Sequence, residues 1–534
     1  MSHKQRGYHL HMKRKFYTLA AMLLLTATTL CAQRLRSESP KAKLQWAEMA
    51  ITNLYVDTVD ENKLVEDAIR GMLEKLDPHS TYSTAKEVKA LNESLEGNFE
   101  GIGVQFNMME DTLVVIQTIA GGPSERGGII AGDRIVIVND TAIAGVKMSK
   151  EDIMRRLRGP KGTKVALKVK RQGFKELLPF TIVRDVIPVH SLDASYVIRP
   201  GIGYIRIGNF GATTYNEFSE ALDKLTEQGI TRLIIDLQDN GGGYLQSAAT
   251  IINDFLERGD MIVYTEGRSN PRMEYRADGR KRFSGEVVVL INEFSASASE
   301  IMAGAFQDQD RGIIVGRRSF GKGLVQRPLE FDDGSMIRLT IAHYYTPSGR
   351  CIQKPYTKGD NKDYARDLDN RLKNGELMSA DSIHFADSLK FQTLREHRTV
   401  YGGGGIMPDH FVPLDTTRYT PFHRQLSAKN YIINANMRFI DSHRKQLKKQ
   451  YKTFEEFNHS FEVPQSLIDS IVSKAAEDGV KPADDDELTR TLPYLTAQLK
   501  ALIARDLWDM TEYYRVMNET NPIVLKALEV MNAL

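Results

Sequence analysis

Two polar residues, Ser297 and Lys322, have the types and the setting that covalent hydrolysis requires. Ser297 lies in the segment Phe294-Ser-Ala-Ser-Ala-Ser-Glu300, and Lys322 follows 25 residues later between two glycines. A serine hydroxyl becomes a nucleophile beside a base, and a lysine is that base when burial lowers its pKa toward neutrality. The two residues therefore form a candidate Ser-Lys dyad, which needs neither a histidine nor a metal ion.

Plainer interpretations of the same residues stay open at this point. Ser297-Ala-Ser-Glu300 fits the Ser-x-x-Glu capping box, in which the serine only begins a helix. Ser295 and Ser299 compete with Ser297 for the role of nucleophile, and helix geometry does not choose among the three. Lysine is seldom buried without a partner, so Lys322 taken alone is more simply a surface residue.

The elements that would position these residues follow an α/β pattern over residues 185–345. The glycines on either side of Lys322 let backbone approach it closely. The sequence predicts a strand there, with Gln326 four residues further on the same face, where it can hold the lysine amine by a hydrogen bond. The other predicted strands are Gly203–Ile207, Leu233–Asp236, Val287–Ile291 and Ile313–Val315, and helices are predicted over Phe218–Gln228 and Tyr244–Arg258.

A glycine turn, Asp239-Asn-Gly-Gly-Gly243, lies between one of these strands and the helix after it. Glycines in that position can direct backbone N–H groups at an anion. The Gly-x-x-x-x-Gly-Lys-Ser/Thr pattern of a phosphate-binding loop is missing, which disfavours a nucleotide site. A plain strand-to-helix turn is the alternative.

Residues 97–184 have a different pattern, in which short β-rich runs alternate with glycine turns and two short predicted helices. This order resembles a PDZ domain, and the run Ile130–Val136 lies at the expected distance. Successive N–H groups of a glycine loop form a nest for a carboxylate, and an extended peptide can add as a strand beside it. The predicted carboxylate-binding loop consists of Gly101, Ile102, Gly103 and Val104.

The first 32 residues predict an export signal. Lys13-Arg-Lys15 is a basic start, Phe16–Leu30 is a short apolar run, and Ala32 is a small residue before a cleavage point. Retention of the run as a membrane anchor and lipidation at Cys31 are alternatives. Cys351 is the second of two cysteines, so no intrachain disulfide is expected once the signal is removed, and we predict a buried structural thiol.

The rest of the chain predicts helical regions that flank the α/β part. They are expected at 41–96 and at 417–534, and a charged insertion is expected at 354–400. The net charge of +2 gives no signal for nucleic-acid binding.

Between Leu76 and Phe411 the chain resembles the C-terminal processing peptidases, also called tail-specific proteases. Several separate motifs in one order make the resemblance specific. They are Asp77-Pro-His-Ser80, the PDZ segment, Asp236-Leu-Gln-Asp-Asn-Gly-Gly-Gly243, Ser295-Ala-Ser-Ala-Ser-Glu-Ile301, Gly316 through Gln326, Tyr345-Thr-Pro-Ser-Gly-Arg350 and Gly405-Ile-Met-Pro-Asp409.

The resemblance implies an α/β fold with a crotonase/ClpP-like serine protease core and an inserted β-rich PDZ domain. The core would comprise residues 185–353 and 401–416, the PDZ domain residues 97–184. The family's nucleophile lies 25 residues before its lysine, which selects Ser297, and its supporting glutamine falls on Gln326. Asp308 matches an aspartate of the pattern, but a helix from Ser297 puts it roughly 16 Å away, so a structural role is expected.

The resemblance also implies an oxyanion hole. It would consist of the Ala298 N–H and the Gly243 N–H, with Gly242 as the next candidate. Oriented N–H donors of this kind typically contribute ~3–4 kcal/mol each. Gly241 stands where many relatives have proline, which loosens the turn without removing its donors.

The implied function is that of an exported serine endopeptidase that cleaves proteins near their carboxyl termini through an acyl-enzyme, without cofactor or metal. Its expected partners are protein or peptide substrates with nonpolar C-termini, a second copy of the chain and an adaptor protein, with no nucleic acid. The expected location is the periplasm, at the inner membrane if the signal is retained. The alternatives are an inert PDZ-containing scaffold and a Ser-His-Asp hydrolase that uses His343 or His190.

Overall fold

The structure is a computed structural model that describes residues 39–533. Contacts within the chain divide it into two units, with the boundary between Lys75 and Leu76. The predicted export signal, with Cys31, lies outside the described residues. The described part of the first unit contains two helices, α2 (Pro40–Leu54) and α3 (Glu61–Glu74).

Both helices of the first unit begin at a capping side chain. Ser39 accepts a hydrogen bond from the Ala42 N–H, and Asp60 accepts one from the Lys63 N–H. The predicted helical region 41–96 extends across the unit boundary, because its last helix, α4 (Ala85–Glu96), belongs to the second unit.

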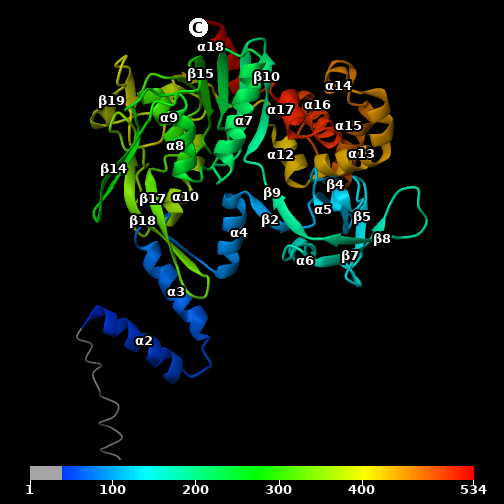
Figure 1. The fold of residues 1–534 in the computed structure, drawn as a ribbon, viewed down its shortest axis with the longest axis horizontal. Coiled ribbons are helices and arrows are strands. Elements are labelled where there is room, and N and C mark those ends of the chain that lie inside the picture. The colour runs from blue at the N-terminus through cyan, green and yellow to red at the C-terminus, as the bar shows by residue number, and fades with distance from the viewer. Residues whose placement is uncertain (1–38, 534) are drawn as a thin grey trace, which may run out of the picture. The chain divides into compact units, whose positions relative to one another are not determined.

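The second unit is built around a six-stranded sheet (Figure 1). The first strand is antiparallel to its neighbour and the others pair in parallel. Parallel strands that are covered on both faces consist of continuous apolar runs, as in Val287–Ile291, where every residue is buried. The order is β10 (Leu192–Arg199), β11 (Ile202–Ile207), β12 (Arg232–Asp236), β15 (Glu286–Ile291), β16 (Ile313–Gly316) and β21 (His410–Phe411).

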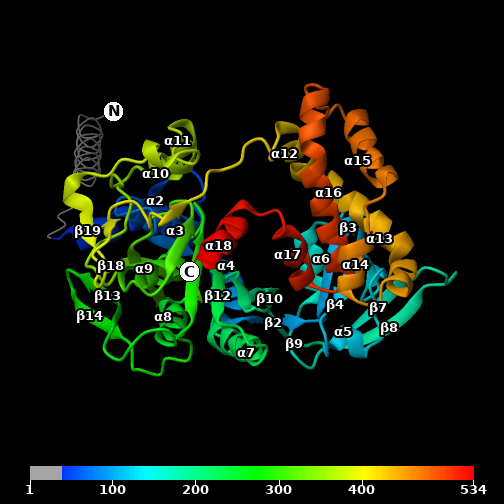
Figure 2. The ribbon, with the colours of Figure 1, turned by 90° about the horizontal axis from the view of Figure 1, so that it is seen from above.

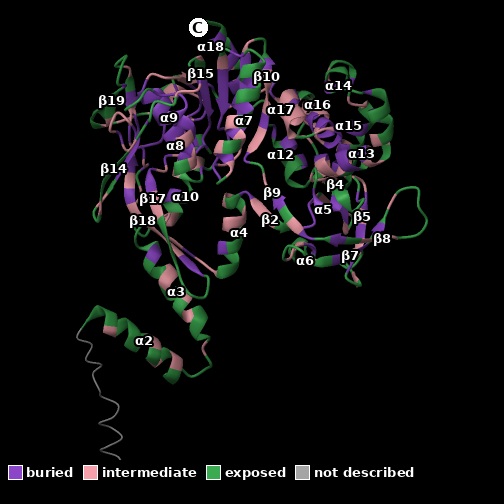
Figure 3. Ribbon diagram, viewed as in Figure 1, coloured by how far each residue is buried: buried purple, intermediate pink, exposed green. Residues whose placement is uncertain are grey.

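Side chains that alternate along these strands divide the core into two layers. Leu233 and Ile235 pack with α7 (Thr214–Glu227), α8 (Leu245–Asn253) and α9 (Ala298–Asp308) on one face. Ile234, between them, packs with α18 (Pro522–Ala533) on the other face. The buried residues of the sheet and of α8 and α9 are purple in Figure 3. The predicted α/β fold is confirmed, with helix ends displaced by several residues; α8, for example, ends at Asn253 rather than Arg258.

A second sheet lies next to the helices and carries part of the candidate site. Its strands are β1 (Thr81–Ser83), β18 (Met336–Tyr345), β13 (Met261–Gly267) and β14 (Asn270–Arg276), and β17 (Leu324–Glu330) also pairs with β18 along most of its length. A register shift in the β17–β18 pair falls between Val325 and Gln326.

The β-rich part predicted as a PDZ domain at residues 97–184 forms a sheet of its own. Alternation of exposed and buried residues, clearest in β7, gives the sheet one apolar face, which packs with α6. The sheet order is β3 (Val104–Met109), β4 (Thr112–Thr118), β5 (Arg134–Val138), β7 (Lys164–Lys170) and β8 (Leu178–Val183), with β6 (Thr141–Ala142) on β5. Two helices, α5 (Pro123–Arg126) and α6 (Lys150–Leu157), complete the domain, and β2 (Asn98–Gly101) pairs with β9 (Asp185–Pro188) where the chain enters and leaves.

The insertion after the core strands contains short elements. These are α10 (Asn361–Ala365), α11 (Asp367–Lys373), the 3₁₀ helices η1 (Ala380–Ser382) and η2 (Asp387–Leu389), and the strands β19 (Lys390–Gln392) and β20 (Thr399–Tyr401).

The C-terminal extension consists of α12 (Pro421–Ala428), α13 (Tyr431–Gln450), α14 (Phe454–Ser460), α15 (Gln465–Glu477), α16 (Asp485–Leu507), α17 (Met510–Met517) and α18. Helices α12 to α17 share an apolar cluster of their own, whereas α18 packs on the central sheet. In Figure 2, α13 lies beside the PDZ strands, to which Asp441 is joined by an ion pair of 2.6 Å with Arg134. Over residues 39–533, no helix combines the length and the apolar character needed to cross a membrane.

Candidate active site

The candidate site residues gather beyond the carboxyl ends of three neighbouring parallel strands. The glycine turn follows β12, Ser297 follows β15, and Lys322 follows β16. Open α/β sheets bind their ligands at this edge, because the connections leave the sheet there in different directions.

Ser297 begins α9 with an unusual backbone conformation. Its φ is 57° and its ψ is −113°, on the side of conformational space that non-glycine residues rarely adopt. Such strain persists where the surroundings hold it in place, and it clusters at functional sites. Ser297 is half-buried, whereas its neighbours Ala296 and Ala298 are buried.

The two competing serines have structural roles. Both are completely buried. The Ser295 hydroxyl donates to the Leu237 carbonyl at 2.8 Å, and the Ser299 hydroxyl donates to the Asn240 carbonyl at 2.9 Å. Geometry thus distinguishes the three serines that the sequence left open: Ser295 and Ser299 bind the nucleophile loop to the glycine turn, and Ser297 is the partly accessible one.

A buried carboxylate, Glu300, connects the loop of Ser297 with the segment of Lys322. Its Oε2 accepts from the backbone N–H groups of Ser297 and Lys322, each at 2.8 Å. Its Oε1 accepts from the Gly321 N–H at 2.7 Å and the Ser319 hydroxyl at 2.5 Å. Burial raises the pKa of Glu300, against the effect of these hydrogen bonds. The sequence presented Glu300 only as a capping residue.

Lys322 is half-buried and lies just before β17, so the prediction that it lies on a strand was wrong. Gly321 has a φ of 91°, and the N–H groups of Gly321 and Lys322 donate to Glu300 before the strand begins. Burial lowers the pKa of the Lys322 ammonium, the positive charge of Arg338 lowers it further, and Glu300 and Asp77 oppose the shift. A general base requires a shift in this direction.

The Tyr344 side chain is a further link between the two segments. Its hydroxyl lies against the Lys322 carbonyl and within 3.2 Å of the Ser297 carbonyl. It is almost completely buried on β18. The backbones of both dyad residues are therefore held by shared partners.

Gln326 lies in β17 opposite Thr340 of β18, to which its Nε2 donates at 3.3 Å. Between Val325 and Gln326 the pairing passes over Ile341 of β18, so the extra residue lies on β18 and not on β17. Lys322 precedes β17, so even spacing along a strand does not explain the position of Gln326, whereas its pairing with Thr340 does.

The glycine turn packs directly on the nucleophile. A β-carbon at Gly242 would lie 2.8 Å from the Ser297 Cβ and 3.0 Å from the Ala298 nitrogen. The Gly242 N–H already donates to the Asn240 Oδ1 at 2.8 Å, so this donor of the two predicted glycines is engaged within the turn. Gly243 is exposed, with φ of 144°, and stays a candidate together with Ala298.

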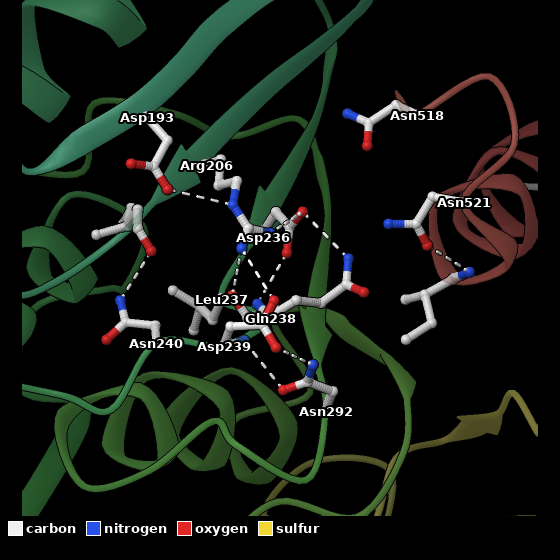
Figure 4. Close-up of polar contacts among 12 residues, drawn as sticks. Asp193, Arg206, Asp236, Leu237, Gln238, Asp239, Asn240, Asn292, Asn518 and Asn521 are labelled. Atoms are coloured by element: carbon white, nitrogen blue, oxygen red, sulfur yellow. Dashed lines mark hydrogen bonds and ion pairs between the residues drawn. The ribbon is translucent and has the colours of Figure 1, made fainter. Parts of the chain in front are cut away.

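A polar network anchors the glycine turn from below (Figure 4). The buried Arg206 guanidinium pairs with Asp236 at 3.0 Å and with Asp239 at 3.3 Å. Asn292, in the loop that leads to Ser297, exchanges two hydrogen bonds with Asp239, at 3.0 and 2.8 Å. Arg206 also lies 4.6 Å from the ring centre of Tyr514, which joins the network to helix α17 of the extension.

Asp308 has the structural role that the sequence suggested. It forms an ion pair of 2.7 Å with Arg350, with both side chains completely buried. Its other oxygen accepts from the Ser348 N–H at 2.9 Å. It thereby holds the turn before Cys351, which is half-buried and whose thiol pKa is raised by burial.

Neither histidine of the rival triad is arranged to activate the serine. His190 is 70% exposed in its side chain and faces Glu217 at 3.7 Å, and His343 packs against Tyr345. Among the hydrogen bonds of residues 39–533, none joins either ring to Ser297.

A third histidine, His79, belongs to the site although the sequence gave it no role. Burial, and then the charge of Lys322, lower its pKa to about 4. Its Nε2 lies 2.8 Å from the Tyr364 hydroxyl of the insertion. The only sequence signal was its place in Asp77-Pro-His-Ser80.

The insertion supports the segment that carries Lys322. The buried Arg371 of α11 donates to the carbonyls of Ser319 and Phe320, at 2.8 and 3.1 Å. Gln353, the residue just before the insertion, accepts from the Gly323 N–H at 2.8 Å. The sequence indicated only a charged insertion and gave it no link to the site.

In the PDZ domain, the predicted carboxylate-binding loop connects β2 to β3. Gly103 has φ of 71°, and its carbonyl accepts from the Ile119 N–H at 3.1 Å, while the Ile102 carbonyl accepts from the Ser124 N–H at 3.0 Å. The strand β3 that follows is an edge of its sheet. An edge strand next to a glycine loop is the geometry to which an extended peptide can add.

Comparison with known proteins gives family matches in the same order. A model described as peptidase family S41 matches residues 201–362, and a PDZ-domain model matches residues 114–171. The model of the activating protease CtpB N-terminal domain matches residues 22–87. A family of unknown function matches residues 422–509, within the helical extension.

The carboxy-terminal processing protease CtpA of Bacillus subtilis is 36% identical over 62% of this chain and 73% of its own length. Its paralogue CtpB is 34% identical over 68% of this chain and 75% of its own length. Among solved structures, the photosystem II D1 C-terminal processing protease is 30% identical, covering 58% of this chain and 84% of that one, with a TM-score of 0.34. The chain belongs to the carboxy-terminal processing proteases, serine peptidases of family S41.

Proposed function

We propose that this protease cleaves polypeptides near nonpolar carboxyl termini by a Ser297-Lys322 dyad. The observation that carries the proposal is the commitment of Ser295 and Ser299 to buried hydrogen bonds. This leaves Ser297, in a strained conformation, as the accessible hydroxyl, and the Glu300 carboxylate connects its backbone to that of Lys322.

In the first chemical step, the neutral Lys322 amine accepts the proton of the Ser297 hydroxyl as Oγ bonds to the scissile carbonyl carbon. The negative charge moves to the carbonyl oxygen, where the N–H groups of Ala298 and Gly243 donate to it. When the C–N bond breaks, the Lys322 ammonium gives its proton to the leaving amine. Water then loses a proton to Lys322 and attacks the ester carbon. The C–Oγ bond breaks, which releases the new carboxyl terminus, and the Lys322 ammonium returns its proton to the Ser297 Oγ.

Substrate selection is assigned to the PDZ domain. The carboxylate of the substrate would lie at the N–H groups of residues 101–104, and the chain before it would pair with the edge of β3. Substitution of Gly103, where a β-carbon would approach Ile187 to 2.9 Å, is expected to distort the loop. It should weaken cleavage of tailed peptides more than labelling of Ser297 by a small serine-reactive probe.

Export to the periplasm is part of the proposal and rests on residues 1–32 of the sequence. Cell fractionation, together with sequencing of the mature amino terminus, tests it and separates cleavage from anchoring and from lipidation at Cys31. Recovery of the full-length chain in the cytosolic fraction alone would refute export.

The dyad is tested with Ser297→Ala and Lys322→Ala, each of which should abolish cleavage of a peptide with an apolar tail. Ser427→Ala, on the exposed part of α12, is the matched control and should cleave at the wild-type rate. A fluorophosphonate probe should label the wild type and not Ser297→Ala. Cleavage by either dyad variant would refute the mechanism, and absence of both labelling and cleavage in the wild type would favour an inert scaffold.

A further inference from the structure

The side chain of Asp77 is buried, and its oxygens accept hydrogen bonds from the residues that follow it and from Thr340 of β18. Its Oδ1 accepts from the backbone N–H groups of His79 and Ser80, at 2.8 and 2.9 Å, and its Oδ2 lies 2.6 Å from the Ser80 hydroxyl. The Thr340 hydroxyl is 3.0 Å from the same Oδ1. These contacts join two segments that are 263 residues apart.

The proton positions in this cluster follow from the donors available. Backbone N–H groups can only donate, so Oδ1 of Asp77 acts as an acceptor. The Thr340 hydroxyl therefore donates its single proton to Asp77. The Thr340 oxygen can then only accept a further hydrogen bond. Its other neighbour, Gln326 at 3.3 Å, must therefore face it with the amide NH₂ group.

This reasoning determines which way the Gln326 amide points, a choice that coordinates alone leave ambiguous for any glutamine. With Nε2 toward Thr340, the carbonyl oxygen Oε1 faces the other way. The surrounding backbone is rigid, because the Thr340 N–H donates to the Ser80 hydroxyl at 3.1 Å and β1 pairs with β18 from Thr81 onward.

We propose that Asp77 and Thr340 are positioning residues that hold the Gln326 carbonyl oxygen toward the Lys322 amine. The inference rests on the proposed dyad and extends it to residues that do not touch substrate. A carbonyl oxygen accepts an N–H of the neutral amine and leaves the lone pair of the nitrogen free for the Ser297 proton. A reversed amide would donate into that lone pair and remove the base.

Asp77 lies close enough to the site for its charge, like that of Glu300, to raise the pKa of Lys322. Asp77-Pro-His-Ser80 thereby acquires a function in the site. The motif supplies the acceptor that starts the chain of hydrogen bonds Asp77–Thr340–Gln326.

The experiment compares Thr340→Val, Thr340→Ser and Thr340→Ala in the full-length protein, with the exposed Thr399→Val of β20 as the matched control. Thr340→Val and Thr340→Ala should lower kcat by ~10–100-fold, the effect of one oriented hydrogen bond to a charged group, with KM unchanged. Thr340→Ser keeps the hydroxyl and should restore most of the rate. The acid limb of the pH profile should move to lower pH in Thr340→Val, because the ammonium loses an acceptor.

The decisive measurement repeats Thr340→Val in a Gln326→Ala background. If Thr340 acts through Gln326, the second substitution causes no further loss in the rate of fluorophosphonate labelling. An equal loss in both backgrounds, with thermal unfolding unchanged, would overturn the proposal. So would wild-type kcat in a folded Thr340→Ala protein. Failure of the dyad itself would appear separately, as labelling that survives Lys322→Ala.

Discussion

Replacement of Glu300 by glutamine tests whether one carboxylate holds the catalytic segments together. The wild-type side chain accepts four hydrogen bonds and is completely buried. Glutamine has the same shape but only one acceptor oxygen. Two of the four donors would therefore face an NH₂ group, whichever way the amide turned.

The expected loss follows from the number and kind of these hydrogen bonds. A hydrogen bond to a charged group typically contributes ~1.5–3 kcal/mol, so losing two costs ~3–6 kcal/mol. Burial raises the pKa of Glu300 because it destabilises the carboxylate charge. Glutamine carries no charge and avoids this cost, which offsets part of the loss. We therefore expect the lower end, about 3 kcal/mol of stability, together with a fall of ~100-fold in reactivity.

Two measurements separate these effects. Urea unfolding followed by tryptophan fluorescence reports stability, and the rate of fluorophosphonate labelling reports the reactivity of Ser297 without any need for the PDZ domain. Glu477→Gln, with a side chain 67% exposed on α15, is the control and should match the wild type in both. If Glu300→Gln kept the wild-type labelling rate and unfolding midpoint, the carboxylate would not be the connection that its contacts indicate.

Three further predictions concern neighbouring parts of the site. Lys322→Met should abolish cleavage yet raise the midpoint of thermal unfolding near neutral pH, because the lowered pKa of Lys322 means that its charge destabilises the folded state. This gain should shrink toward pH 10, where the lysine becomes neutral in the folded and unfolded states alike. A lower midpoint than that of the wild type at pH 7 would contradict this. Ser295→Ala and Ser299→Ala should each cost ~1 kcal/mol of stability and retain labelling, whereas Ser297→Ala keeps stability and loses labelling. Arg206→Met should cost ~3–5 kcal/mol by leaving buried Asp236 unpaired, with exposed Arg272→Met as the silent control, as measured by urea unfolding.

Most of the fold could be predicted from the sequence because its signals are local. Apolar runs bounded by glycines located β11, β12, β15 and β16, and the alternating pattern of residues 97–184 located the PDZ strands. The helix at Ser297 followed from the Ser-x-x-Glu pattern, and the structure has it as α9, from Ala298 to Asp308. Its cap was also the source of the ambiguity, since a capping serine and a nucleophile have the same local sequence.

The details of the site that the sequence did not supply depend on partners far apart in the chain. The resemblance had selected Ser297, but the physical reason that Ser295 and Ser299 are engaged elsewhere lies in the carbonyls of Leu237 and Asn240, about sixty residues away. The orientation of Gln326 required a hydroxyl on β18, in a register set by a bulge in β18. A bulge has no reliable sequence signal, because it depends on how two strands accommodate each other's twist.

The interval of 25 residues between Ser297 and Lys322 has a physical reason in the fold. Ser297 stands at the carboxyl end of β15, α9 then runs back along the sheet, and β16 returns in parallel beside β15. The helix starts at one edge of the sheet, and the parallel strand after it finishes at that same edge. The residue before the helix and the segment after the strand therefore lie at one edge. Glu300, in the first turn of the helix, is then within reach of the segment that follows the returning strand, so one buried carboxylate can bind Ser297, Gly321 and Lys322 at once. A change in the length of α9 or β16 would displace the base from the nucleophile, which makes the spacing a requirement of the α/β unit rather than an arbitrary feature of the motif.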